Sequence, residues 1–361
     1  MKLITRTSPI AVHFGALETR ILQLNGGPKG WAVRCAEEVD AAGGGRHMAV
    51  VENLQPRIKE LKTLGKDCLV SLSGDDVAVS LVPVDEHNRS KMQQTLKDTA
   101  LRSINDPEGV MYRYIPLNGS EHEENMQARE ELLLLSVGQS EKRRCEDALD
   151  NLRLRTCGLE VSAFPLARSL QAMHGDLDSP WGFLHLGFGH SFFGIMQGGE
   201  LRFLKPMQLN GERLVSTLDK VLNAKEIDLT DISFGDVDEE DSANAEGTQA
   251  TSISKLAEQA IGRGAELLHA LRLESESVAQ EVRACLRHYA NRHRGAKLNQ
   301  VFLTGFGANL PEVEGSLATA LKMPTEIAQP FTKLGIDAPQ HVLDNQHLWA
   351  IPLGLAMRGY K

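Results

Sequence analysis

The 361-residue sequence predicts an α/β fold of two similar lobes, with a small α+β subdomain inserted into the first lobe. The main observation is a repeat: the stretches VHFG (12–15) and LHLG (184–187) each end an apolar strand in His-x-Gly. Each stretch opens a run of three strands that is followed by helices. A duplicated unit of this kind forms two lobes with a cleft between them. The composition agrees, because 42% hydrophobic and 24% charged residues over this length are typical of two or three compact units.

Composition also argues against several classes of function. The chain has 39 basic and 48 acidic residues, and a net charge of −9 does not favour nucleic-acid binding. Five widely spaced cysteines without a Cys-x-x-Cys pair are typical of reduced, structural thiols in a cytoplasmic protein. No segment approaches ~18 consecutive apolar residues, so we expect no direct insertion into a membrane. We interpret the acidic run at 236–241 as a solvated loop.

The first lobe is predicted to comprise residues 1–84 and 158–174. Alternating or continuous apolar runs indicate its strands, and leucines at helical spacing indicate its first helix. The elements expected, in chain order, are strands at 10–15, 18–24 and about 31–38, a helix near 52–65, strands at 68–72, 77–84 and 159–161, and a helix at 164–173.

Residues 85–157 are predicted to form the inserted subdomain. The elements expected there are a helix at 88–104, strands at 110–117 and 132–137, and a helix at 139–155. Gly158, which follows Cys157, is the expected C-cap of the last helix.

The second lobe is predicted to comprise residues 175–361. It repeats the three-stranded start of the first lobe, with a Gly198-Gly199 turn between its second and third strands. The elements expected are strands at 182–187, 191–196 and 201–206, helices at 210–223, 252–271 and 275–293, a strand at 300–304 with a turn at 305–308, and helices at 312–321 and 348–358.

Seven stretches in register carry a resemblance to a known family. Residues 10–20 (IAVHFGALETR) and 183–209 are similar to two phosphate loops, and residues 301–310 (VFLTGFGANL) are similar to an adenosine motif. The other stretches are 130–170, Asn210-Gly211, 281–289 and 348–358. Their order resembles that of the actin-like superfamily and, within it, the PilM family of type IV pilus assembly proteins. FtsA-like cell-division proteins are more distant relatives.

The resemblance implies an actin-like (ribonuclease H-like) fold. The insertion would be the small subdomain that PilM and FtsA carry in place of actin's subdomain 1B. In PilM proteins a groove beside it holds the short cytoplasmic tail of an inner-membrane partner, PilN. The resemblance therefore implies a cytoplasmic scaffold of a type IV pilus or type II secretion-like system. A PilN-like tail would recruit it to the inner membrane, and other copies of the chain are a further candidate partner.

The resemblance also places a nucleotide cleft. If the cleft is retained, its residues are His13, Gly15, Arg20, His185, Gly187, Gly305, Phe306 and Gly307. In active members of the superfamily the strand-end Asp of each phosphate loop organises hydrated Mg²⁺, because a hard cation beside a triphosphate needs anionic oxygen ligands. Here His13 and His185 stand at those two places. Neutral imidazole is a poor Mg²⁺ ligand, and protonated imidazole repels the ion.

We therefore expect a degenerate ATPase with no catalytic residues, and ATP bound weakly if at all. Two alternatives stay open, a slow actin-like ATPase that uses other carboxylates and an FtsA-like filament protein at the membrane. Arg20 could still contact phosphate, whereas Glu18 beside a triphosphate would be unfavourable. Phe306 could stack on a base or fill the cleft. His13, His185 and His190 could gather a transition metal, but no Cys or carboxylate stands at ligand spacing, so no metal is expected.

Overall fold

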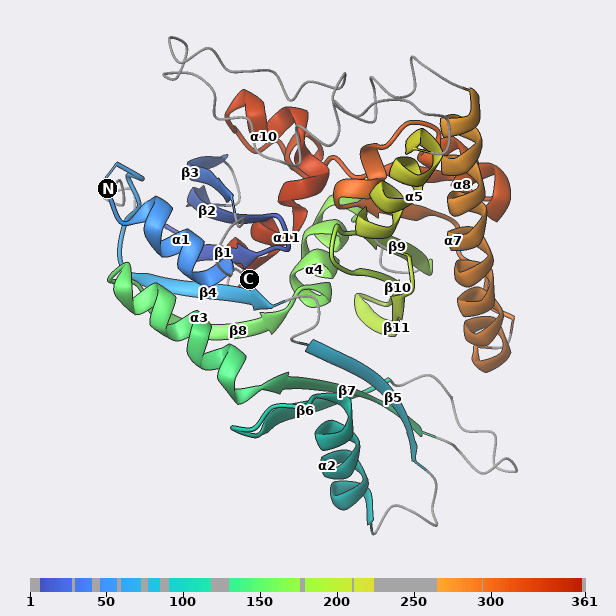
Figure 1. Ribbon diagram of the computed structural model, residues 1–361, viewed down its shortest axis with the longest axis horizontal. Helices are drawn as coiled ribbons and strands as arrows, with labels where there is room; N and C mark the ends of the chain where they lie inside the picture. The colour runs from blue at the N-terminus through green and yellow to red at the C-terminus, as the bar shows by residue number, and fades with distance from the viewer. Residues whose placement is uncertain are drawn as a thin grey trace.

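The computed structural model describes residues 7–27, 30–40, 46–56, 60–72, 77–84, 91–117, 130–175, 179–209, 211–223, 265–293 and 295–358. The acidic run at 236–241 and the first part of the helix expected at 252–271 lie outside the described residues. The described residues form two large sheets with their helices, and a third, smaller sheet lies at one end of the molecule (Figure 1).

The first sheet has five strands in the order β3-β2-β1-β4-β8. The strands β1 (Ile10–Phe14), β2 (Glu18–Gly27) and β3 (Gly30–Asp40) form an antiparallel meander. Strands β4 (Asp67–Leu72) and β8 (Arg155–Val161) extend the sheet in parallel from β1. Every residue of the central strand β1 is buried, which agrees with a sequence that is apolar except at His13.

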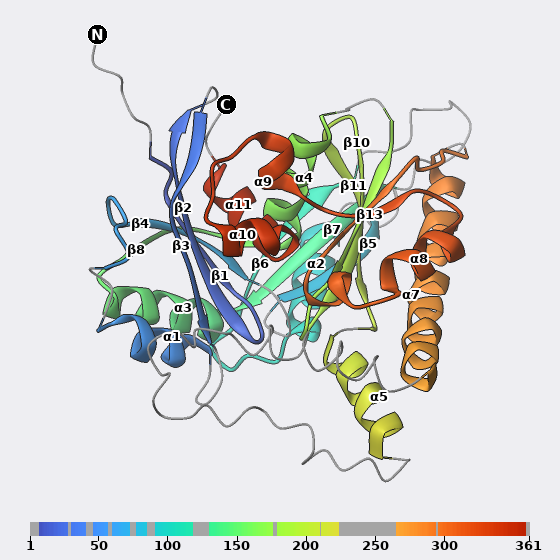
Figure 2. The same cartoon turned by 90° about the horizontal axis from the view of Figure 1, so that it is seen from above.

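The second sheet repeats this topology with the order β11-β10-β9-β12-β13. The meander consists of β9 (Trp181–Leu186), β10 (Ser191–Gln197) and β11 (Glu200–Met207). Strands β12 (Val301–Thr304) and β13 (Thr325–Ile327) are parallel to β9. The identical order and sense of the strands confirm the duplicated two-lobe fold that the His-x-Gly repeat predicted. Figure 2 shows the two sheets on either side of the helices between them.

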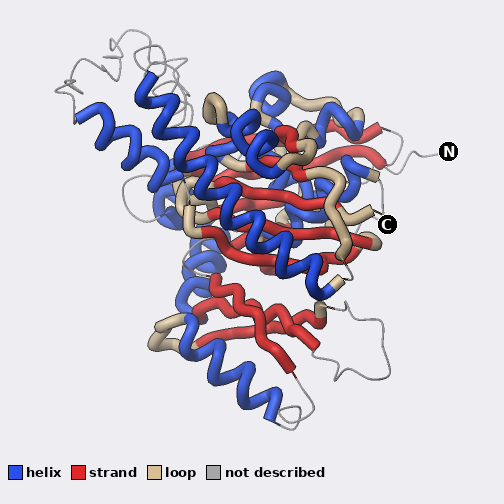
Figure 3. Tube along the Cα trace, turned by 90° about the vertical axis from the view of Figure 1, so that its right-hand side faces the viewer, coloured by secondary structure: helices blue, strands red, loops and turns tan. Residues whose placement is uncertain are grey.

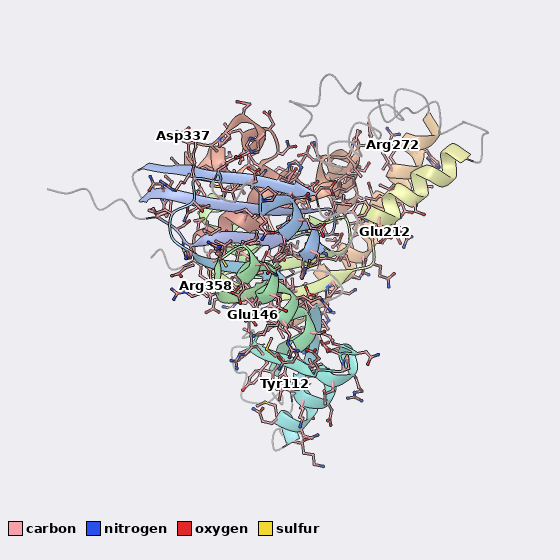
Figure 4. The ribbon with its side chains drawn as sticks, turned by 60° about the vertical axis from the view of Figure 1, so that its left-hand side comes forward. Tyr112, Glu146, Glu212, Arg272, Asp337 and Arg358 are labelled. Carbon is pink, nitrogen blue, oxygen red and sulfur yellow. The ribbon has the colours of Figure 1, made fainter. Side chains whose placement is uncertain are left out.

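The third sheet is antiparallel, in the order β5-β7-β6, and is built from β5 (Val77–Val84), β6 (Val110–Pro116) and β7 (Glu130–Gly138). Helix α2 (Met92–Ser103) packs on one face through Leu96 and Ala100. The other face, through Leu133 and Leu135, shares a core with the second sheet. Figure 3 shows this unit projecting from the larger body. In Figure 4 Tyr112 marks the unit and Asp337 lies at the opposite side of the molecule.

Two elements do not lie in the unit to which the sequence assigned them. Strand β5 was assigned to the first lobe, yet it pairs with β7 along its whole length. Helix α3 (Gln139–Asn151) was assigned to the insertion, yet its Cys145 and Leu149 are buried in the core of the first sheet, beside helix α1 (Arg46–Leu54). We therefore propose that the inserted unit runs from about residue 77 to about residue 138, and the remaining domain limits stay predictions.

The predicted C-cap at Gly158 is wrong. Helix α3 ends at Asn151, and Arg153 adopts a positive φ of 58° that turns the chain into the next strand. Gly158 itself lies inside β8 opposite Leu69. A Cβ at Gly158 would lie 3.2 Å from Leu69 Cδ2 and 2.9 Å from Arg358 Nη1, so this glycine permits close packing and does not end a helix.

The remaining helices cover the sheets. Helices α4 (Ala163–His174) and α11 (Gln346–Ala356) pack against each other between the two large sheets (Figure 2). Helix α7 (Ala265–Arg292) is continuous where the sequence predicted a break near residue 272, and with α5 (Gly211–Asn223) and α8 (Val313–Leu321) it flanks the second sheet. Short helices α9 (Pro330–Leu334) and α10 (Gln340–Asp344) precede α11. Among the described helices, none has the length and apolarity needed to cross a membrane.

Candidate functional site

The two repeated histidines occupy equivalent places in the two large sheets. His13 in β1 lies opposite Ser71 of the parallel strand β4, and its Nδ1 is 2.6 Å from Ser71 Oγ. His185 in β9 lies opposite Thr304 of the parallel strand β12, and its Nδ1 is 3.1 Å from Thr304 Oγ1. Both imidazoles are therefore held at the end of a central strand by a hydroxyl from the neighbouring strand.

The hydroxyl contact at Nδ1 directs the other ring nitrogen of each histidine toward its glycine bend. His185 Nε2 lies 2.9 Å from the point where a Cβ on Gly187 would stand, and His13 Nε2 lies 3.7 Å from the corresponding point on Gly15. The first bend is closed by a hydrogen bond of 2.9 Å from the Gly15 N–H to the Glu18 carbonyl. An imidazole edge thus lies beside each bend.

Burial keeps two of the histidines near this site neutral. Desolvation, with His190, Arg20 and His347 nearby, holds the pKa of His185 well below its usual 6.5. Desolvation, with Arg20 nearby, lowers the pKa of His347 in α11 to about 4. At pH 7 these side chains are uncharged, and an uncharged imidazole has little affinity for Mg²⁺.

The lowered pKa of His347 makes the protein less stable in mild acid. In the unfolded chain the His347 imidazole binds a proton below about pH 6.5, whereas in the folded chain it does so only near pH 4. The contribution of neutral His347 to stability is therefore complete above pH 6.5 and falls as the pH drops toward 4. We expect His347 alone to account for a loss of ~3 kcal/mol between pH 7 and pH 4. Urea denaturation at several pH values measures this loss, which His347→Gln should reduce and His341→Gln, at an exposed position of α10, should leave unchanged. Equal pH dependence in the two variants would contradict the assignment.

Arg20 is committed to carboxylates of its own sheet. Its guanidinium pairs with Glu18, and its Nε donates to Glu38 Oε2 at 2.5 Å. The guanidinium also lies 5.9 Å from the centre of the Trp349 ring. Arg20 and Glu18 are both buried, so their charges neutralise each other at the edge of the cleft. Arg20, the cation that could have contacted a phosphate, is therefore paired with Glu18 and Glu38.

Phe306 fills space beside the cleft. It is 6% exposed and packs edge-on against Phe188, with ring centres 5.8 Å apart. The start of α5 lies directly against it, because a Cβ on Gly211 would be 2.7 Å from Phe306 Cδ1. Of the two roles open to this side chain, filling the cleft is the one that its packing supports.

Gly305 holds a conformation that other residues rarely adopt. Its φ is +83°, and a Cβ there would lie 2.7 Å from the Leu186 carbonyl oxygen. The Gly305 N–H donates to the His347 carbonyl at 3.3 Å, which ties this turn to α11. Gly307 instead packs on Leu186, behind the turn.

One cleft gathers these elements. Seven of the eight residues predicted for the site line this cleft, and the exception is Gly307. The seven are His13, Gly15, Arg20, His185, Gly187, Gly305 and Phe306. The two bends almost touch, since a Cβ on Gly189 would lie 2.8 Å from Ala16 Cβ. The volume inside the cleft that water can occupy is about 50 Å³, which is enough for a few water molecules.

The partners of the site residues were missed from the sequence. Ser71, Thr304, Glu38 and His347 all contact a predicted site residue or its turn. A hydroxyl residue at or near the end of an apolar strand is the one signal that Ser71 and Thr304 share. In the part of the chain that the structure describes, His13, His185 and His190 do not form a three-ligand metal group, although the rings of His185 and His190 lie 6.0 Å apart.

Comparisons with known proteins agree with this architecture. A family model described as type IV pilus assembly protein PilM matches residues 267–360. No curated protein sequence matches the chain significantly. A solved PilM-PilN type IV pilus biogenesis complex is similar with a TM-score of 0.72 and 17% identity, over 98% of this chain and 99% of that chain. The ethanolamine utilization protein EutJ from Carboxydothermus hydrogenoformans is similar with a TM-score of 0.51 and 12% identity, over 98% and 90% of the two chains. The likenesses to solved structures show the fold, and the match to the PilM family model covers residues 267–360.

Proposed function

We propose that this chain, a PilM-like protein with an actin-like fold, is a scaffold of type IV pilus or type II secretion-like assembly that does not hydrolyse ATP. It would bind the short cytoplasmic tail of a PilN-like inner-membrane partner and be recruited to the inner face of that membrane from the cytoplasm. The match of residues 267–360 to the PilM family and the solved PilM-PilN complex of the same fold support the class of partner.

The replacement of both metal-organising positions by imidazole carries the proposal that hydrolysis is lost. His13 and His185 are each fixed by a strand-end hydroxyl, and burial favours the neutral form of His185. Glu18, the carboxylate that lines the cleft, is paired with Arg20. A triphosphate with Mg²⁺ would have to disrupt that buried pair, and the anionic Glu18 would then repel it.

We expect no Mg²⁺-dependent ATP turnover above the background of the assay. The measurement is phosphate release by the purified full chain with ATP and Mg²⁺, with an active actin-like ATPase as positive control. Turnover that EDTA abolishes would contradict the proposal and favour the slow-ATPase alternative. Calorimetry should likewise find weak nucleotide binding, and a submicromolar affinity for Mg-ATP would overturn that expectation.

Partner binding is expected to map to residues 85–170. The measurement is hydrogen exchange of the intact chain with and without a synthetic peptide of the tail of an inner-membrane protein encoded beside it. Protection should concentrate in the small sheet, α2 and the adjoining α3 and α4. Protection confined to the second sheet and α7 would contradict the prediction that the partner binds within residues 85–170.

Two exposed leucines give matched variants for this map. Leu101 on α2 and Leu273 on α7 are 51% and 52% exposed, so a charge at either position should leave the fold intact. We expect Leu101→Glu to weaken peptide binding and Leu273→Glu to leave it unchanged, as measured by fluorescence anisotropy. The reverse order of effects would move the docking surface to α7.

A further inference from the structure

A second group of side chains with ligand chemistry lies away from the cleft. His47 comes from α1, and Glu141 and Cys145 come from α3, one helical turn apart on the same face of that helix. Helices α1 and α3 lie side by side against the first sheet (Figures 1 and 2). We call these three residues the His–Glu–Cys cluster. Its side chains are buried, with His47 6%, Glu141 3% and Cys145 0% exposed.

The three ligand atoms of the cluster converge on one point. His47 Nε2 lies 2.8 Å from Glu141 Oε1 and 3.4 Å from Cys145 Sγ. Cys145 Sγ lies 3.7 Å from Glu141 Oε1. A tetrahedral zinc ion with bonds of about 2.0–2.3 Å sets its ligand atoms roughly 3.3–3.6 Å apart. Moving His47 Nε2 and Glu141 Oε1 about 0.5 Å further apart therefore turns this triangle into one face of a zinc tetrahedron.

The second oxygen of Glu141 is held from outside the cluster. Arg144 donates to Glu141 Oε2 from Nε at 2.9 Å and from Nη2 at 2.7 Å, which leaves Oε1 facing His47 and Cys145. The ring of Phe14 stacks on His47 with centres 4.7 Å apart and fixes the plane of the imidazole. Such outer contacts orient metal ligands in proteins.

The donor set selects the class of ion. A thiolate, an imidazole and a carboxylate suit a borderline cation such as Zn²⁺, whereas Mg²⁺ and Ca²⁺ prefer sites made of oxygen alone. A Zn²⁺ ion with one thiolate, one carboxylate and one neutral imidazole carries no net charge, which lowers the cost of its burial.

We propose that the His–Glu–Cys cluster is a zinc site that fastens α1 to α3. With an ion present, His47 in the first turn of α1 is tied to two turns of α3, and the stack of Phe14 on His47 links the site to the strand that carries His13. A zinc ion held by three protein ligands takes water as its fourth ligand. Without zinc, the same atoms form a hydrogen-bonded group in which Glu141 Oε1 accepts from His47 and Cys145.

Zinc titration of the full chain tests the proposal. After dialysis against a chelator, the protein competes for Zn²⁺ with a chromophoric chelator, and we expect one ion per chain and a raised thermal midpoint. Cys145→Ser should weaken zinc binding by about 100-fold or more, because serine removes the soft ligand. The matched control is Cys285→Ser, at a buried cysteine of α7, which should bind zinc as the parent does.

Cobalt provides a readout that does not depend on the variants folding. Co²⁺ added to the parent chain should give the thiolate-to-cobalt absorption of a four-coordinate site. The proposal is overturned by a parent chain without stoichiometric zinc, by a cobalt spectrum without a thiolate band, or by equal zinc affinities of Cys145→Ser and the parent.

Discussion

Gly354→Ala is expected to lower the free energy of unfolding by about 3 kcal/mol or more, because it inserts a methyl group between two packed helices. A Cβ at Gly354 of α11 would lie 1.7 Å from the Pro165 carbonyl oxygen and 2.5 Å from its carbonyl carbon. These are backbone atoms of α4, so no side-chain rotation relieves the overlap. The Gly354 carbonyl also accepts a hydrogen bond of 2.7 Å from Arg168, which a shift of α11 would break.

The matched control for this substitution is Gly315→Ala in α8. A Cβ at Gly315 would have no neighbour within 4 Å. Alanine in a helix is favoured over glycine, so this variant should gain roughly 0.5–1 kcal/mol. Urea denaturation of both variants measures the contrast. A Gly354→Ala chain as stable as the Gly315→Ala chain would show that α4 and α11 are not packed as closely as described.

Arg20→Met is expected to cost about 3–5 kcal/mol of folding free energy, because it leaves two carboxylates without their cation. Glu18 is 3% exposed, and the Glu38 side chain is 20% exposed. Methionine retains much of the packing on Trp349, so the loss reports mainly on the charges.

An exposed ion pair gives the comparison for Arg20. Arg143 donates to Glu108 at 3.0 Å, with side chains 64% and 37% exposed. Arg143→Met should change stability by roughly 0–1 kcal/mol. Similar losses for the two arginine variants, measured by thermal or urea denaturation, would argue that Arg20 is not buried between its glutamates and would return it to the candidates for phosphate binding.

Both substitutions test the surroundings of the cleft. Helices α4 and α11 lie between the large sheets, and α11 carries the His347 carbonyl that holds Gly305. The Arg20–Glu18 pair occupies the first bend. Under the proposed scaffold role, a cleft neutralised by this pair would hold the two lobes in one arrangement and leave binding to the small sheet.

Local pattern was sufficient to predict the repeat and most elements. His-x-Gly after an apolar run depends on a few consecutive residues, so both central strands and both bends were found at positions 10–15 and 182–187. Local pattern also misled at Gly158, where a glycine after a charged helix looked like a C-cap. The conformation of Gly158 is set by the pairing of β8 with β4. In that pairing Gly158 lies opposite Leu69, which comes 89 residues earlier in the chain.

Residue type and short-range spacing are enough to predict the duplicated α/β architecture and to place a histidine at the end of each central strand. Which partner each polar side chain meets depends on the tertiary structure. His13 meets Ser71 across 58 residues, His185 meets Thr304 across 119, and His47 meets Glu141 across 94. Parallel strands and packed helices bring such residues together through the cooperative burial of apolar faces, and no local spacing encodes those contacts.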